Sequence, residues 1–342
     1  MRKCLISNSN ELFSAIKANA KLYIPVDLEK GRVAYKEYQD GMTMSDALKT
    51  DRSAKDFFFP QTQTLMAFKT EGKNIEVIDV RSETEDFVVF GVRGCDVMSL
   101  EVLDKVFLAE PVDSYYKNRR EHGVIVSMAC ARPVETCFCQ TFGVDPSAPK
   151  GDITCYKTDD AFYFEANTEK GKALLNKLDG VTEECDDKAV KEQKAKIKEV
   201  MDKLPLKDLK ADAFGADKTD KYFDAPEWQS LSESCLGCGT CTFVCPTCQC
   251  YDIKDFKTKS GVERFRCWDS CMYSDFTKMS AGQPRLTQKE RFRQRFMHKL
   301  VYFPTNNDGM FSCVGCGRCI AKCPISMNIV KVMKTLGGKE ND

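Results

Sequence analysis

The chain has 342 residues, enough for about two domains, and its 51 basic and 51 acidic residues leave no net charge. Balanced charge gives no reason to expect binding to nucleic acid, and no apolar run approaches the roughly 18–20 residues of a membrane span. The first ten residues lack the apolar core of a signal peptide, so we expect a cytoplasmic protein and exclude secreted and membrane-spanning classes.

Short apolar strands alternate with helices in the first half of the chain. Strands rich in Val, Ile and aromatic residues are predicted at 21–26, 74–80, 86–92 and 123–130. A helix follows the third strand, with Asp96 expected at its N-cap and apolar residues at helical spacing up to Phe107. A polar helix is predicted at 114–122 and a β-hairpin at 153–167. These elements predict a mixed α/β domain over residues 1–225 that ends in a charged helical connector.

The cysteines are concentrated in the last third of the chain. Of 19 cysteines, seven lie in residues 1–234 and twelve in 235–342, while the chain has only two histidines. Cysteine clusters in a protein without an export signal bind metal more often than they form disulfides. Thiolate is therefore the expected ligand type.

One segment is repeated, and we name its copies the first motif (CLGCGTCTFVCP, 235–246) and the second motif (CVGCGRCIAKCP, 313–324). Each reads C-x2-C-x2-C-x3-C-P, the spacing by which bacterial ferredoxins hold [4Fe–4S] clusters, with the fourth cysteine serving the other cluster. This spacing predicts two clusters. The first is assigned to Cys235, Cys238, Cys241 and Cys323, and the second to Cys313, Cys316, Cys319 and Cys245.

Structural zinc is the competing interpretation of these motifs. Zinc sites favour two separated C-x2-C pairs, often with histidine, whereas here four cysteines lie within eleven residues, twice. The 67 residues between Cys245 and Cys313 contain a predicted helix with a capping box at Thr287 and Glu290. This long insert resembles the α-helical ferredoxin domain of fumarate-reductase-type iron–sulfur subunits. We therefore expect an α-helical dicluster domain over residues 226–342.

Eight of the eleven remaining cysteines lie upstream of these motifs or between them, and their roles are less constrained. Four of them could converge at one end of the α/β sheet on a third cluster, since two of the four each follow a predicted strand; the spacing equally allows buried free thiols. These four are Cys95, Cys130, Cys137 and Cys139. Four others follow the first motif and could be extra ligands, redox-active thiols or buried thiols. They are Cys248, Cys250, Cys267 and Cys271.

Several segments together resemble one known family over nearly the whole chain. They are CPTCQCYD, WDSCMYSDF, ERFRQRFMHK and CVGCGRCIAKCP, with GVRGCD and TCFC upstream. The family includes the β subunits of cytosolic sulfhydrogenases and the corresponding subunits of anaerobic sulfite reductases and of heterodisulfide-reductase-like complexes. The resemblance implies an iron–sulfur subunit that passes electrons between a flavin subunit handling NAD(P)H and a catalytic redox subunit. It also favours the third cluster.

Some expected signatures are absent from the sequence. No G-x-G-x-x-G follows a strand and no P-loop occurs, so a nucleotide site of standard type is not predicted. We therefore expect a non-catalytic electron relay in an anaerobe's oxidoreductase complex. The alternative is a self-contained iron–sulfur flavoprotein with flavin in the α/β domain, and a third interpretation is a zinc-stabilised scaffold.

Overall fold

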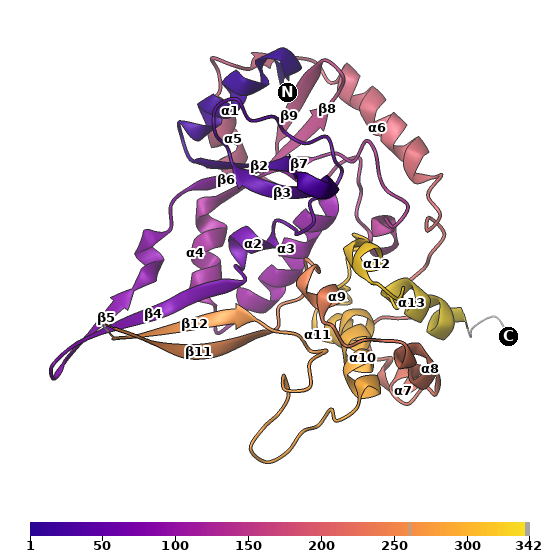
Figure 1. The fold of residues 1–342 in the computed structure, drawn as a ribbon. Helices are drawn as coiled ribbons and strands as arrows, with labels where there is room; N and C mark the ends of the chain where they lie inside the picture. The colour runs from indigo at the N-terminus through magenta and orange to yellow at the C-terminus, as the bar shows by residue number, and fades with distance from the viewer. Residues whose placement is uncertain (260, 339–342) are drawn as a thin grey trace.

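The computed structural model describes residues 1–259 and 261–338, apart from the side chains of residues 82 and 83. Its larger sheet has eight strands in the order β10–β1–β9–β8–β7–β6–β2–β3 (Figure 1). These are β1 (Arg2–Leu5), β2 (Lys21–Leu28), β3 (Arg32–Glu37), β6 (Phe87–Arg93), β7 (Gly123–Met128), β8 (Ile153–Lys157), β9 (Ala161–Ala166) and β10 (Glu183–Glu184). Strands β2, β6, β7 and β8 are parallel to one another and the outer strands are antiparallel to their neighbours. The predicted mixed α/β region is confirmed.

Helices cover both faces of this sheet because its central strands alternate buried side chains between two cores. Val88 and Phe90 of β6 pack with α1 (Ser9–Lys17) and α5 (Glu169–Asn176), while Phe87 and Val89 pack on the opposite face. The elements on that opposite face are α2 (Lys55–Phe58), α3 (Gly94–Phe107), α4 (Ser114–His122) and α6 (Lys188–Met201).

Helix α3 begins earlier than its sequence predicts. Arg93 is at the N-cap and makes no side-chain capping bond, and residues from Gly94 onward are helical. The prediction that Asp96 caps the helix is therefore wrong, because a cap must precede the first helical residue. Asp96 instead lies in the first turn, 1 % exposed, and its carboxylate accepts hydrogen bonds from Arg318.

A smaller four-stranded sheet joins the two halves of the chain. Its order is β11–β12–β4–β5, and β12 pairs antiparallel with β4. The strands are β4 (Thr62–Glu71), β5 (Asn74–Asp79), β11 (Tyr251–Thr258) and β12 (Gly261–Trp268). The C-terminal region is thus not purely helical, which corrects our expectation for residues 226–342. The β11–β12 hairpin forms because the N-terminal half supplies β4 as a third strand, and an isolated hairpin is only marginally stable.

Short helices surround a second core in the C-terminal region. They are α7 (Thr219–Tyr222), α8 (Glu227–Glu233), α9 (Thr240–Phe243), α10 (Gln288–Met297), α11 (Phe303–Asn306), α12 (Arg318–Lys322) and α13 (Ile329–Gly337). The predicted capping box is confirmed, since Thr287 accepts from the Glu290 amide and donates its own amide to the Glu290 carboxylate. A π-helical turn, His298–Tyr302, continues α10.

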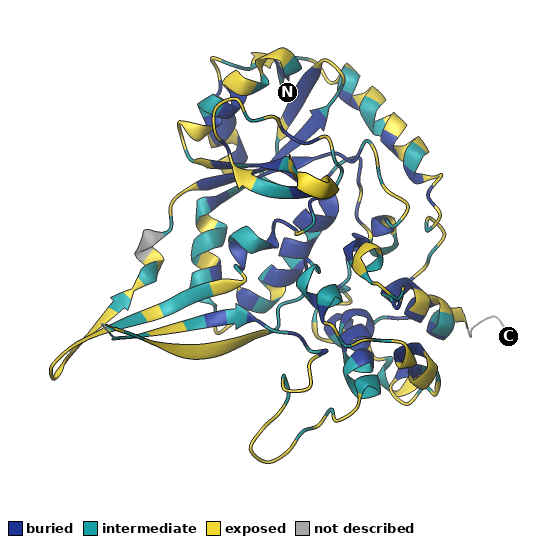
Figure 2. Cartoon of the chain, viewed as in Figure 1, coloured by how far each residue is buried: buried dark blue, intermediate teal, exposed yellow. Residues whose placement is uncertain are grey.

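Residues on both sides of position 225 contribute to this second core. Ala211, Phe214 and Tyr222 pack with Trp228 and with the apolar side of α10. Figure 2 shows this core and the strands in the middle of the large sheet as buried, whereas β11 and the far tip of the small sheet are exposed. The division of the chain at residue 225 stays a prediction.

No helix in the described part of the chain has both the length and the apolar character needed to cross a membrane.

Candidate iron–sulfur centres

The first thiol set surrounds a cavity of about 30 Å³ between α9, α10 and the segment that follows α12. Its members are Cys235, Cys238, Cys241 and Cys323. Phe292 and Phe296 of α10 form part of the cavity wall, and Gln288 donates a hydrogen bond of 3.4 Å to the Cys235 sulfur. The structure therefore brings together four thiols from two motifs, as the crossed ligand pattern predicts. That they bind a cluster stays a prediction.

The second thiol set gathers around Cys245. The negative charge of Cys245 contributes to the raised pKa of Cys313, Cys316 and Cys319, so Cys245 lies close to each of these three thiols. Burial is the largest cause for those three and raises the pKa of Cys313 to about 12. The pKa of Cys245 is instead lowered, first by a hydrogen bond from Cys248, against a burial effect that would raise it. A thiolate at Cys245 is the form in which cysteine binds metal.

The N-terminal thiol set lies at one end of the parallel strands β6 and β7. Cys95, Cys130, Cys137 and Cys139 surround a cavity of about 20 Å³, and Cys316 of the second motif lies in its wall. Burial raises the pKa of Cys139 to about 12. The Lys49 ammonium donates to the Cys137 sulfur at 3.4 Å and to the Cys316 carbonyl at 2.6 Å. Four thiols far apart in sequence thus face one cavity, although ligation of a third cluster stays a prediction.

Two glycines allow the second motif to approach the N-terminal thiols. Gly315 and Gly317 have φ of +59° and +74°, which side chains rarely adopt. A Cβ at Gly315 would lie 2.3 Å from the Phe138 carbonyl oxygen, and one at Gly317 would lie 2.1 Å from that of Thr136. The Phe138 amide also donates to the Gly315 carbonyl at 3.0 Å. The loop holding Cys137 and Cys139 therefore packs directly against the second motif.

Three buried cations lie among the thiols of the C-terminal region. Lys55, Arg295 and Lys299 are only 2–3 % exposed, and none forms an ion pair with a carboxylate within the described part of the chain. Arg295 donates to the Cys248 sulfur at 3.3 Å and to the Cys241 carbonyl at 2.8 Å, and its Nε is buried without a partner among the described residues.

The two lysines contact the backbone and hydroxyl groups around the second thiol set. Lys299 donates to the Thr247 hydroxyl at 2.8 Å, and Lys55 donates to the Cys248 carbonyl at 3.0 Å. Burial alone would lower the pKa of Lys299, but the charges of Cys245 and Cys248 outweigh this effect, so the net shift is upward. Burial lowers the pKa of Lys55 to about 8. Burying cations without carboxylates is costly, so this donor set fits a negatively charged group such as a thiolate-bound iron–sulfur cluster.

Of the four cysteines that follow the first motif, three have another thiol as a neighbour and the fourth, Cys267, lies on a strand. Cys248 contacts Cys245, and Cys250 and Cys271 contact each other through their thiols. Cys267 lies on β12 and is paired with Asp252 and Thr62 of the neighbouring strands. Among the described residues, no three His, Cys, Asp or Glu side chains are grouped closely enough to hold a single metal ion.

Sequence reasoning missed the cations that face the thiols. Lys49 and Lys55 come from N-terminal segments without any motif, so no local pattern identifies them. Arg295 and Lys299 could have been identified, because they are four residues apart and each precedes a buried apolar residue, Phe296 or Leu300. On the outer side of helix α10, the guanidinium carbon of Arg293 lies 3.7 Å from the centre of the Phe223 ring.

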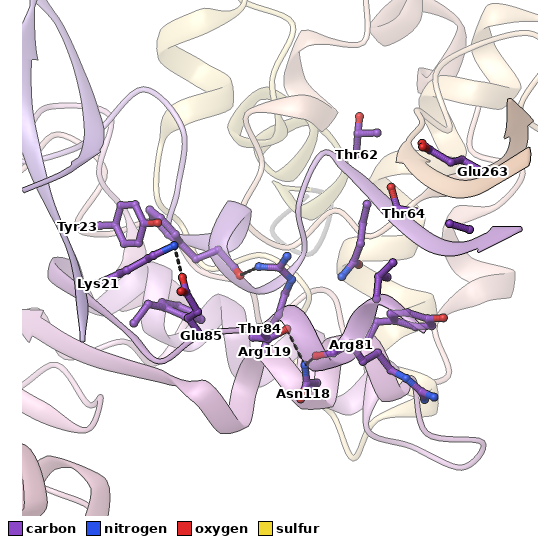
Figure 3. Close-up of a pocket in the computed structure, with 16 residues that line it drawn as sticks. Lys21, Tyr23, Thr62, Thr64, Arg81, Thr84, Glu85, Asn118, Arg119 and Glu263 are labelled. Carbon is purple, nitrogen blue, oxygen red and sulfur yellow. Dashed lines mark hydrogen bonds and ion pairs between the residues drawn. The ribbon is translucent and has the colours of Figure 1, made fainter. Parts of the chain in front are cut away.

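A larger pocket of about 500 Å³ lies between the two sheets, with no cysteine among its described lining residues. Figure 3 shows Lys21, Tyr23, Arg81, Asn118 and Arg119 around it. Its charged groups are largely paired within the protein: Lys21 forms an ion pair with Glu85, and Arg119 donates to a backbone carbonyl at 3.3 Å. The pocket is polar and separate from the thiols.

Comparison with known proteins agrees with this arrangement. Residues 234–327 match the family described as a 4Fe-4S dicluster domain. The chain is 33 % identical over 333 residues to sulfhydrogenase 2 subunit beta of Pyrococcus furiosus, covering 94 % of each chain. No solved structure matches. With thiols gathered from both motifs and a relative similar along nearly its whole length, the chain belongs to the iron–sulfur subunit family that includes this sulfhydrogenase β subunit.

Proposed function

We propose that this chain is a non-catalytic electron relay that carries three [4Fe–4S] clusters. The first cluster takes Cys235, Cys238, Cys241 and Cys323; the second takes Cys313, Cys316, Cys319 and Cys245; the third takes Cys95, Cys130, Cys137 and Cys139. Support comes from the two thiol-lined cavities and from the buried cations that face thiols rather than carboxylates. When bound, such clusters accept and release one electron at a time, with potentials set by burial and nearby charge.

The observation that carries the proposal is that the three thiol sets adjoin. Cys316 belongs to the second set and also lies in the wall of the N-terminal cavity. Cys245, also of the second set, is close enough to Cys241 of the first set to raise its pKa. The sets therefore form a continuous series through the protein, which is what a relay requires.

The first set is the end of this series that faces solvent. Cys238 is exposed and Leu236 is 67 % exposed, whereas Val314, at the matching position of the second motif, is 2 % exposed. An exposed cluster edge lets the redox centre of a partner approach.

We infer two partners in a cytoplasmic complex. One is a flavin subunit that handles NAD(P)H, and the other is a catalytic redox subunit of the hydrogenase, sulfite reductase or heterodisulfide-reductase-like type. The name of the Pyrococcus relative, a subunit of a sulfhydrogenase, supports a place in such a complex.

Metal analysis of anaerobically purified protein tests the proposal. We expect about 12 iron and 12 acid-labile sulfide per chain, and about 8 of each after Cys137→Ser with Cys139→Ser. Cys155→Ser is the matched control, since Cys155 is a fully buried thiol outside all three sets. Zinc in place of iron would contradict the relay, and 8 iron in the fully loaded wild type would remove the third cluster alone.

The alternative is a self-contained iron–sulfur flavoprotein, and the 500 Å³ pocket is the observation that favours it. A pocket of this size lies within the usual range for small-molecule sites. Flavin that remains with the purified lone chain at about one per chain would establish this alternative, and flavin-free protein with full iron content would support the relay.

A further inference from the structure

Two cysteines outside the three thiol sets are brought together by the β11–β12 hairpin. Cys250 immediately precedes β11, and Cys271 follows the end of β12 by three residues. Tyr251 pairs with Trp268, and the Asp269 amide donates to the Cys250 carbonyl at 2.9 Å, which extends the ladder by one residue. The base of the hairpin therefore juxtaposes the two thiols, and Cys271 donates a hydrogen bond to Cys250.

The segment that carries Cys271 is fixed against the first motif. Ser270 is fully buried; its hydroxyl accepts a hydrogen bond of 2.8 Å from Thr242 and one of 3.2 Å from the Met272 amide. Thr242 follows Cys241 directly, so Cys271 is held beside the first thiol set. The charges of Cys241 and Cys271 are close enough to interact.

Cys250 lies toward the second thiol set. It is close enough to Cys248 for their charges to interact, and Cys248 contacts Cys245. The hydrogen bond with Cys250 and burial raise the pKa of Cys271, with Arg295 and Lys299 acting only partly against this, whereas the pKa of Cys250 is lowered, first by the hydrogen bond from Cys271 and also by Lys299. The pair thus lies between two proposed one-electron centres, and Cys250 is the member of the pair that favours the thiolate a disulfide-forming reaction needs.

The contact between the two sulfurs differs from the arrangement of the proposed ligands. The first and N-terminal sets surround cavities, whereas the base of the hairpin brings Cys250 and Cys271 close enough to share a hydrogen bond. A cluster between them would have to part them. A disulfide needs only that they close to about 2.05 Å.

We propose that Cys250 and Cys271 form a dithiol–disulfide couple that exchanges two electrons with the first and second clusters. Oxidation breaks both S–H bonds, forms the Sγ–Sγ bond, releases two protons to water and passes one electron to each of the two clusters. Reduction is the reverse. The electron transfer rests on the proposed function, whereas the couple itself depends only on the two thiols. It gives a one-electron relay a site that can hold a pair of electrons.

The test uses the full-length, cluster-loaded chain under anaerobic conditions. Samples are equilibrated in buffers of reduced and oxidised dithiothreitol, which reach the pair because both thiols are partly exposed. They are then quenched in acid, alkylated and examined by mass spectrometry for the peptide linked through Cys250 and Cys271. We expect the linked peptide to follow a two-electron curve, with about 30 mV per tenfold change in ratio. Cys267→Ser is the matched control and should leave the curve unchanged.

A second arm tests the connection to the clusters. Without dithiothreitol, a reduced viologen should remove the linked peptide from loaded protein, and at least tenfold more slowly from protein stripped of iron. Cys250→Ser and Cys271→Ser should each abolish the linked peptide while retaining all the iron. Two results overturn the couple: both thiols alkylated at every potential, or about four iron lost in either serine variant, which would make them cluster ligands. Failure of the relay is distinguishable, because it appears as missing iron while the dithiothreitol curve remains measurable.

Discussion

Replacement of Asp96 by Asn should destabilise the protein strongly, because it leaves a buried guanidinium without its countercharge. Arg318 in the second motif donates to the two Asp96 oxygens at 2.5 and 2.7 Å, and the side chains are 3 % and 1 % exposed. Removing one partner of such a pair costs about 3–5 kcal/mol. That equals roughly two to four powers of ten in the unfolding equilibrium constant.

Anaerobic urea titrations of the cluster-loaded chain, followed by tryptophan fluorescence and visible absorbance, measure this effect. Asp255→Asn is the matched control, since its pair with Arg264 has the same charges but is 44–48 % exposed, and such pairs contribute little. The double variant Asp96→Leu with Arg318→Met should regain much of the loss, because both charges leave together. Equal midpoints for Asp96→Asn and Asp255→Asn would refute this reasoning.

Four further substitutions test other parts of the structure. Cys323→Ser should alter the EPR signal of the first cluster; a change confined to the second cluster would disprove the crossed ligand pattern. Gly317→Ala should lower the iron content of the N-terminal site, because its Cβ would lie 2.1 Å from a backbone oxygen; Gly309→Ala, also at positive φ but with open space, should not. Lys299→Met should lower the potential of the nearest cluster on the order of 100 mV by removing a buried positive charge, as potentiometric EPR would show. Burial lowers the pKa of His298 from 6.5 to about 4, so unfolding takes up a proton between these values and stability falls as pH falls. From pH 7 to 5.5 this costs about 1 kcal/mol, and urea midpoints of His298→Gln should lack that loss.

Local sequence patterns predicted the helices and strands whose formation depends on residues close to one another in the sequence. The strands β6 and β7 follow from continuous apolar runs, and α10 follows from its capping box. Cys95 and Cys130 could be placed at one end of the sheet, because each follows a strand and the two strands are parallel neighbours. These predictions needed only periodicity and the geometry of parallel strands.

Contacts between the two halves of the chain could not be predicted in this way. Residues 251–268 form a hairpin because β4, almost 200 residues earlier, supplies its neighbouring strand. The Asp96 carboxylate was assigned to its own helix, whereas its partner Arg318 lies 222 residues away. A local rule cannot identify a partner at that separation, and in both cases the tertiary contact determined the outcome.

The two motifs show most directly what residue identity does not determine. Their cysteines, glycines and prolines coincide at an offset of 78 residues, yet Leu236 is 67 % exposed and its counterpart Val314 is 2 % exposed. The difference arises because the N-terminal half covers the second motif at this position: Val314 lies in a core with N-terminal residues, and Asp96 and the loop that holds Cys137 contact the same motif. One sequence difference between the motifs reflects this packing: the second motif has Arg318 where the first motif has Thr240. Ligand spacing therefore indicates how many clusters to expect, whereas packing against the rest of the chain determines which cluster a partner can reach.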